Sequence, residues 1–180
     1  MEEAKVAAAG RIIHRDRLLK KVGIDTDVMI ALIDDIEQFS MFKPKIFSRN
    51  NFLYINYVVF SELIGYFIHQ GYSKEKALQK IFSYLRKNNI NILNKKTTNI
   101  QKVNQIFEDL KKQRNRLKVE AGNKDLEIIS IYKVHNIELI YSRNKFHFKP
   151  YCEYVKIVFE QLQDDVDIMW KQLFGWKKRR

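Results

Sequence analysis

The chain has 180 residues, of which 46% are hydrophobic and 30% charged, which predicts one soluble globular domain with a substantial core. No apolar stretch reaches the ~18–20 residues that a membrane-spanning helix needs, and the first ten residues lack the apolar length of a secretory signal. The single cysteine, Cys152, excludes an internal disulfide and any zinc site that needs two or more cysteines. We therefore expect a cytoplasmic protein that contacts no membrane.

The net charge of +12 is concentrated in the middle of the chain. Between Gln70 and Asp125 there are 14 Lys and Arg residues against five Asp and Glu residues. A basic surface attracts polyanions, whereas an isolated basic run is more often the solvated face of a helix. The imbalance of the whole chain favours a nucleic-acid partner but gives no information about chemistry.

Short apolar runs alternate along the chain with segments of helical periodicity. The sequence predicts a basic extension over residues 1–20. Ser73 and Thr98 are the predicted N-caps of two helices. The segments around Pro44 and at 143–150 are predicted to be loops. The predicted strands are 20–25, 52–56, 90–93, 137–142 and 154–159. The predicted helices are 28–39, 57–70, 74–89, 98–114, 125–136 and 161–174.

This alternation is typical of a parallel sheet covered by helices on both faces. We expect an α/β protein with three α/β/α layers and an extra C-terminal helix. The expected organisation is a basic N-terminal extension over 1–20, a nuclease-like domain over 21–160, and an amphipathic helix with a basic tail over 161–180.

Glycines and histidines exclude several common sites. The six glycines stand far apart, so the chain has no phosphate-binding loop of the Walker type and no dinucleotide fingerprint. The four histidines lack the HExxH spacing, and His69 and His135 fall near helix ends, where a structural role is the better interpretation. A Ser–His–Asp set stays open at this stage.

Acidic and amide side chains follow the predicted strands or begin the next helix. Asp25 and Asp27 follow the first strand, Asp125 opens the helix 125–136, and Asn144 follows the strand that ends at Ser142. The carboxyl edge of an α/β sheet is where ligands bind, and oxygen ligands suit Mg²⁺. Glu62 adds a carboxylate inside the apolar run YVVFSELIGYF, where burying an acid costs free energy unless something compensates it.

Each of these residues also has a simpler explanation by itself. Asp25 and Asp125 are good N-caps for the helices that follow them. Glu62 could pair with a neighbouring lysine, and Ser142 and Asn144 could shape a turn. The joint pattern is more informative than any one member.

Taken together, these segments resemble the PIN-domain family. KVGIDTDVMIALID resembles the opening strand of the family with its terminal Asp, and VVFSELIGYF resembles the second motif with its single Glu. DLEIISIYKVHNIELIYSRNKFHF resembles the third and fourth motifs. The motifs are short and degenerate, so the specificity lies in their order and spacing over roughly residues 21–160.

The resemblance implies that Asp25, Glu62 and Asp125 are catalytic ligands for Mg²⁺ or Mn²⁺, and that Asn144 is the fourth catalytic residue. Ser142 and Asp27 would then be auxiliary groups. Many family members have Asp where this chain has Asn144, which puts the number of metal ions in question. Glu127 lies two residues beyond Asp125 and is not expected to be a ligand.

The resemblance also implies a function, namely a metal-dependent endoribonuclease that hydrolyses RNA phosphodiester bonds. Many small members are VapC-like toxins, so an antitoxin partner and a homodimer are implied as well. Arg143 and Lys145 are the residues we expect to contact RNA phosphates. The aromatic residues of NKFHFKPY could either stack on unpaired bases or pack the loop against the domain.

Three alternatives remain. The chain could be a catalytically inactive PIN-like RNA-binding or scaffolding subunit, although the retained acids argue against this. It could instead be a housekeeping RNA-processing nuclease. A helix-turn-helix DNA reader formed by 73–88 and 98–114 is disfavoured, because the predicted strand INIL separates those helices and such a motif allows a turn of only ~3–4 residues.

Overall fold

The computed structural model describes residues 19–117, 119 and 121–162. In this part of the chain five parallel strands form one sheet in the order β3-β2-β1-β4-β5. The strands are β1 (Lys20–Ile24), β2 (Asn51–Asn56), β3 (Ile90–Leu93), β4 (Leu139–Ser142) and β5 (Val158–Gln161). The predicted parallel α/β sheet is confirmed.

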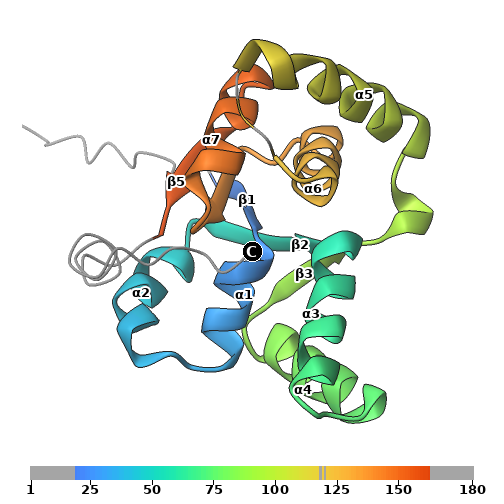
Figure 1. Cartoon of the computed structure of the whole chain (residues 1–180). Coiled ribbons are helices and arrows are strands. Elements are labelled where there is room, and N and C mark those ends of the chain that lie inside the picture. The colour runs from blue at the N-terminus through green and yellow to red at the C-terminus, as the bar shows by residue number, and fades with distance from the viewer. Residues whose placement is uncertain (1–18, 118, 120, 163–180) are drawn as a thin grey trace, which may run out of the picture.

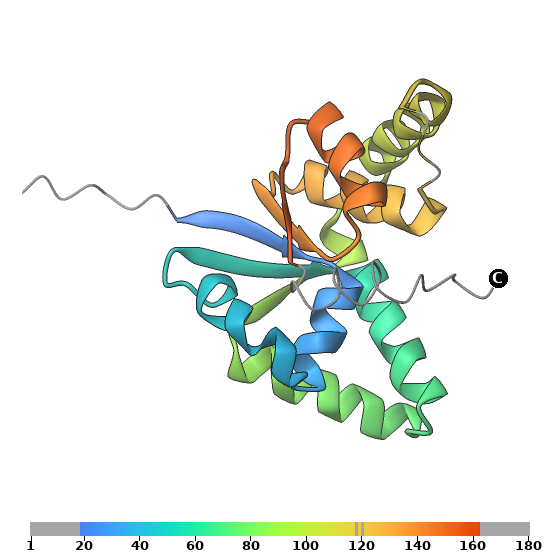
Figure 2. The ribbon, with the colours of Figure 1, turned by 60° about the vertical axis from the view of Figure 1, so that its left-hand side comes forward.

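Helices cover both faces of this sheet. The helices α1 to α4 lie on one face and α5 to α7 on the other, which gives the expected three layers (Figures 1 and 2). The α-helices are α1 (Thr26–Ile33), α2 (Lys43–Ile46), α3 (Tyr57–His69), α4 (Lys74–Lys87), α5 (Ile100–Leu117), α6 (Asn123–Val134) and α7 (Lys145–Tyr154). Two short 3-10 helices are η1 (Glu37–Phe42) and η2 (Lys95–Thr97).

No helix among the described residues is long and apolar enough to span a lipid bilayer. The predicted extension up to residue 18 and nearly all of the predicted C-terminal helix and tail, from 163 onward, lie outside the described residues. Leu162, predicted to lie in that helix, is buried and follows directly after β5.

The strand order reverses at β1. The chain runs from β1 outward through β2 to β3, then returns to place β4 and β5 on the other side of β1. All strands are parallel, so their carboxyl ends share one edge, and the ends of β1 and β4 lie side by side at the point of reversal. In open α/β sheets this is where ligands bind.

Three predicted boundaries were wrong for local reasons. The helix predicted over 28–39 ends at Ile33, and Asp35 has a positive φ of 51° that breaks it before η1. The segment around Pro44 is not a loop but the short helix α2, because proline is tolerated in the first turn of a helix. Thr98 does not cap α5, since Asn99 accepts a hydrogen bond from the backbone N–H of Lys102 at 3.0 Å instead.

The loop predicted at 143–150 is also wrong, because α7 occupies most of it. Asn144 caps this helix, and Phe148, Tyr151 and Cys152 are fully buried along one of its faces. Their burial stabilises a helix that the internal Pro150 would disfavour locally. The strand predicted over 154–159 consequently begins later, as β5.

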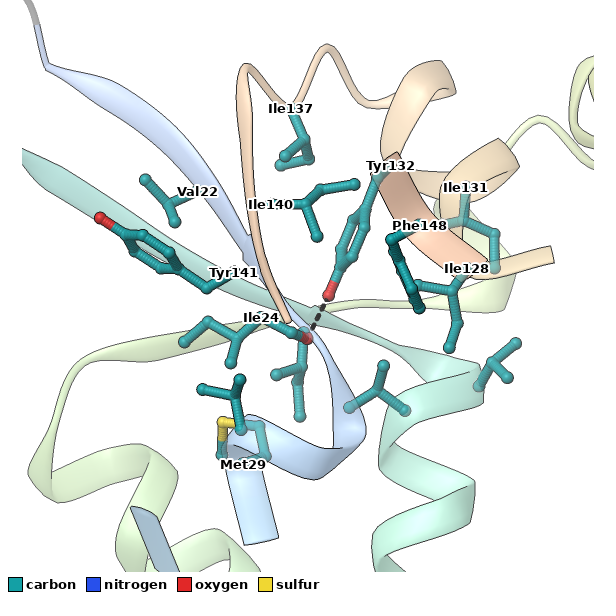
Figure 3. Close-up of a cluster of buried hydrophobic side chains, with 14 of the residues drawn as sticks. Val22, Ile24, Met29, Ile128, Ile131, Tyr132, Ile137, Ile140, Tyr141 and Phe148 are labelled. Atoms are coloured by element: carbon teal, nitrogen blue, oxygen red, sulfur yellow. Dashed lines mark hydrogen bonds between the residues drawn. The ribbon is translucent and has the colours of Figure 1, made fainter. Parts of the chain in front are cut away.

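Tyr132 of α6 ties the central strands together from within the core. Its fully buried hydroxyl donates to the carbonyl oxygen of Ile24 at 2.7 Å and lies 3.3 Å from the carbonyl oxygen of Tyr54 (Figure 3). Burial, and then the nearby charge of Asp25, hold the pKa of this phenol well above its ordinary value, so it stays a neutral donor. The ring reaches β1 because Gly23 has no side chain there.

We predict that Gly23→Ala destabilises the protein by about 1–3 kcal/mol, as overpacking of a core does. A Cβ atom at Gly23 would lie 2.7 Å from the Tyr132 ring, which is itself confined by the core. The measurement is the free energy of unfolding in urea. Gly65→Ala is the control, because nothing lies within 4 Å of a Cβ there, so alanine in α3 should be neutral or stabilise by up to ~1 kcal/mol. Equal stabilities of the two variants would contradict the prediction.

Candidate functional site

Asp25 and Ser142 meet where the strand order reverses. Asp25 follows β1 directly, and its backbone N–H donates to the carbonyl oxygen of Tyr141 in β4 at 3.0 Å. Ser142, the last residue of β4, donates through its hydroxyl to Oδ2 of Asp25 at 2.8 Å. Both side chains are buried. Two residues far apart in sequence are therefore joined by a direct hydrogen bond, as expected from their positions at strand ends.

Asp27 lies beside Asp25 in the first turn of α1. Burial is the largest cause that raises the pKa of both carboxyl groups, and the charge of Asp27 raises the pKa of Asp25 further. A hydrogen bond with Asp25 acts in the opposite direction on Asp27 and lowers its pKa. The backbone N–H of Arg143 donates to both oxygens of Asp27, at 3.2 and 3.4 Å. Ionising the pair completely therefore costs free energy.

Glu62 reaches the same region from α3. Its Oε2 accepts a hydrogen bond from the hydroxyl of Thr26 at 2.5 Å, and Thr26 stands between the two aspartates. Its Oε1 lies 3.2 Å from the ammonium of Lys124, which confirms the simpler expectation that Glu62 has a lysine partner. The carboxylate is half-buried, and the ion pair compensates its charge.

Asn56 positions the helix that carries Glu62, and sequence reasoning missed it. This fully buried residue ends β2, and its Oδ1 accepts hydrogen bonds from the backbone N–H groups of Val58 and Val59 at 3.0 and 3.1 Å. Its amide also lies 3.4 Å from the carbonyl oxygen of Ile128 in α6. An Asn directly before an apolar helical run was the available signal.

Asp125 is the third residue of α6 and not its N-cap, which is Gly122. Its Oδ2 accepts from the backbone N–H of Gly122 at 3.2 Å and lies 2.9 Å from Nδ1 of His147. Asp125 is close enough to Asp25 that its charge contributes to the raised pKa of that residue. The third predicted acid therefore lies near the first.

His147 was also missed by sequence reasoning. The backbone N–H of Asn144 donates to the hydroxyl of Ser142 at 2.9 Å, and the amide nitrogen of Asn144 lies 2.8 Å from Nδ1 of His147. That Nδ1 serves one partner at a time, because it donates to Asp125 when protonated and accepts from Asn144 when not. The backbone N–H of His147 also donates to Oδ1 of Asn144 at 3.3 Å, so a chain of hydrogen-bonded residues runs from Asp25 to Asp125 when Nδ1 donates to Asp125. Helical spacing from Asn144 would have indicated His147, had the segment been predicted as a helix.

The predicted acids gather at one edge but do not converge on one point. Within the described ranges no group of three or more His, Cys, Asp or Glu side chains is arranged so that it could hold a metal ion. Asp25 and Asp27 form one pair, while Glu62 and Asp125 each turn toward a basic partner, Lys124 and His147 respectively. Glu127 lies elsewhere, 3.3 Å from the hydroxyl of Tyr57, as expected of a residue outside the site.

The predicted RNA contacts lie beside these carboxylates. The charge of Arg143 lowers the pKa of Asp27, so its guanidinium lies near the cluster, and Lys145 is exposed in the first turn of α7. The basic segment 70–125, in contrast, is divided. Helix α4 packs on α3 and α5 packs on α6, on opposite faces of the sheet (Figure 1). The segment therefore supplies two separate basic surfaces.

Comparison with solved structures identifies the fold. No protein-family model and no curated protein matches the sequence. The chain is similar to a chain of VapBC2 from Rickettsia felis, with a TM-score of 0.59 at 17% identity over 79% of this chain and 99% of that one. It is also similar to a chain of VapBC-1 from nontypeable Haemophilus influenzae, with a TM-score of 0.56 at 13% identity over 78% and 97%.

A chain of the DNA-bound VapBC from Salmonella typhimurium gives a TM-score of 0.56 at 17% identity over 79% of this chain and 98% of that one. The chain has a VapC-like PIN-domain fold. The fold that the sequence motifs implied is thereby confirmed. At these identities the likeness to VapC-like PIN domains concerns the backbone arrangement, and the chemistry of the site has to be argued from its own residues.

We predict that Asp25→Asn stabilises this PIN-domain chain at neutral pH in the presence of EDTA. A carboxyl whose folded-state pKa lies above its ordinary value of 3.8 loses stability as the pH rises from that value through the folded-state pKa. Asparagine has no charge to lose and keeps one oxygen for the backbone N–H of Thr26, while its amide nitrogen can donate to the hydroxyl of Ser142. The advantage of the variant should be present at about pH 8 and be lost below about pH 3, where Asp25 is protonated in both states.

The measurement is the free energy of unfolding in urea across this range. Asp109→Asn is the control. Asp109 is exposed in α5 and its ion pair with Lys112 is long, at 3.7 Å, so its replacement should change the free energy of unfolding little at any pH. If the difference in free energy of unfolding between Asp25→Asn and the wild type does not vary with pH, the raised pKa of Asp25 is contradicted.

Proposed function

We propose that this chain is a metal-dependent endoribonuclease in which Asp25, Glu62 and Asp125 hold Mg²⁺ or Mn²⁺, with Asn144 as a fourth catalytic residue. The observation that supports this proposal is the gathering of the acids from three separate segments around the carboxyl ends of β1 and β4, within a VapC-like PIN-domain fold. Asp27 and Ser142 are auxiliary groups in this proposal.

The donor chemistry of the cluster fits a hard divalent cation. Its members offer carboxylate, amide and hydroxyl oxygens, which Mg²⁺ and Mn²⁺ prefer. Burial raises the pKa of Asp25 and of Asp27, and the charge of Asp27 raises that of Asp25 further, so a cation beside them would favour the ionised carboxylates. Binding would require Glu62 and Asp125 to exchange Lys124 and His147 for the ion, which side-chain rotation can accomplish.

The protein's own groups determine how such an ion would be used. When bound, a divalent cation polarises a phosphate oxygen and lowers the pKa of water. Ser142 and the backbone N–H of Thr26 fix both oxygens of Asp25, so this carboxylate is already oriented. Asn144 is uncharged, which favours one ion over two. The Arg143 guanidinium, close to Asp27, is placed to contact the anionic backbone of RNA.

The biological role we propose is that of a toxin neutralised by a protein antitoxin. Three solved structures with a similar fold are of VapBC assemblies, one of them bound to a DNA fragment from their promoter. An antitoxin partner, a homodimer and a cytoplasmic location follow from this proposal. A housekeeping RNA-processing nuclease would use the same residues, and a neighbouring antitoxin gene would separate the two roles.

The purified chain should cleave single-stranded RNA of mixed sequence in the presence of Mn²⁺ or Mg²⁺ and lose this activity in EDTA. Loss of a group that only supports a metal ligand typically costs about 10–100-fold in activity. The cleavage rate should fall by more than that in each of three variants: Asp25→Asn, Glu62→Gln and Asp125→Asn. Glu108→Gln is the matched control, because Glu108 is exposed on α5, where it pairs with Lys111, and it should retain full activity.

A second measurement on the same variants tests metal binding directly. Mn²⁺ at about 100 times its dissociation constant should stabilise the wild type by about 2.7 kcal/mol and raise its melting temperature, whereas Asp25→Asn should respond little. Cleavage that survives EDTA or the substitution of Asp25 would refute the proposal. A wild type that binds RNA but never cleaves it would favour the RNA-binding scaffold.

A further inference from the structure

Phe146 is the most exposed large hydrophobic side chain among the described residues. It is 81% exposed, whereas its neighbours Phe148 and Tyr151 on the same helix are fully buried. Those two residues pack α7 against the domain, so packing accounts for them and leaves Phe146 unexplained. An exposed phenylalanine gains none of the ~1.5–3 kcal/mol that burial of such a side chain provides.

Phe146 belongs to the turn of α7 that carries two residues of the site, although at helical spacing its ring points to another face of the helix than theirs. It follows Asn144 by two residues and directly precedes His147, whose Nδ1 lies 2.9 Å from Oδ2 of Asp125. The exposed ring therefore stands at the first turn of α7, the same turn that contributes Asn144 and His147 to the hydrogen-bonded path described above. Of the exposed aromatic residues in the described part of the chain, Phe146 is the one that lies within three residues of both Asn144 and His147 in sequence.

Exposed cations accompany the ring. Lys145 precedes Phe146 in the same turn, and Lys149 follows one turn later with 48% of its side chain exposed. Lys149 pairs with the carboxylate of Glu153 at the long distance of 3.7 Å. The surface around Phe146 thus combines a flat apolar ring with positive charge. A matching ligand must offer flat aromatic faces and negative charge together.

We propose that Phe146 is a stacking platform for an unpaired base of RNA. This inference rests on the proposed function and names a residue that contributes to its preference for unpaired RNA. Bases in a duplex already stack on each other, so their faces are unavailable, whereas a single strand exposes them. Stacking tolerates every base, so Phe146 selects for unpaired RNA and not for a sequence.

The test measures RNA binding separately from cleavage. A fluorescein-labelled single strand of about 12 nucleotides, and the same strand annealed to its complement, are titrated with protein in EDTA and followed by fluorescence anisotropy. The variants are Phe146→Ala, Phe146→Leu and Phe146→Tyr. Phe52→Ala is the matched control, because Phe52 is also exposed, at 47%, but lies near the start of β2, at the opposite edge of the sheet.

Phe146→Ala and Phe146→Leu should each weaken binding of the single strand by at least about fivefold, because both remove the ring. Phe146→Tyr, which keeps the ring, should bind as the wild type does, and so should Phe52→Ala. Duplex binding should not change in any variant. The exposed position of Phe146 predicts an unchanged melting temperature for all three of its variants.

Single-strand affinity of Phe146→Ala within about twofold of the wild type would overturn the inference, and so would equal losses on single strand and duplex. The outcome is independent of the proposed cleavage. If the wild type cleaves RNA through Asp25 while Phe146→Ala binds normally, the inference fails and the nuclease proposal stands. If Phe146→Ala loses single-strand binding but no protein cleaves, the inference stands and the nuclease proposal fails.

Discussion

Two carboxyl groups held side by side in a buried position impose the main constraint on this structure. Asp25 and Asp27 repel each other once both are ionised, and burial removes the water that would screen them. The fold answers with uncharged donors: the hydroxyl of Ser142 and the backbone N–H groups of Thr26 and Arg143. These donors do not fully offset the cost of burying the two carboxyl groups, since both pKa values stay raised. Such a cost destabilises a purely structural site, whereas it favours the binding of a cation.

The core beneath the carboxylates holds their backbone in place. The hydroxyl of Tyr132 binds the carbonyl oxygen directly before Asp25, and it can do so because Gly23 leaves room for the ring. Asn56 caps the helix that carries Glu62 and contacts α6 from the neighbouring strand end. Polar side chains thus replace a continuous apolar core at the point where the strand order reverses.

Among the described residues near the carboxylates, positive charge has two distinct locations. Lys124 and His147 contact the acids themselves. Lys145 and Lys149 are exposed on α7, one residue before and three residues after Phe146. The long basic segment that dominates the composition lies mostly elsewhere, divided between opposite faces of the sheet (Figure 1). The local arrangement of a few cations is therefore more informative than the net charge.

The sequence alone determined the parallel α/β architecture, because short apolar strands between amphipathic helices leave few other ways to bury both faces of a sheet. It also placed Asp25 and Ser142 at one edge, since parallel strands end together. Tertiary structure alone decided that Phe148 packs while Phe146 is exposed, and that His147 meets Asp125. Those choices depend on α7, whose stability comes from burial against distant segments and not from the local pattern around Pro150. Contacts of this kind are set by topology, which no local periodicity records.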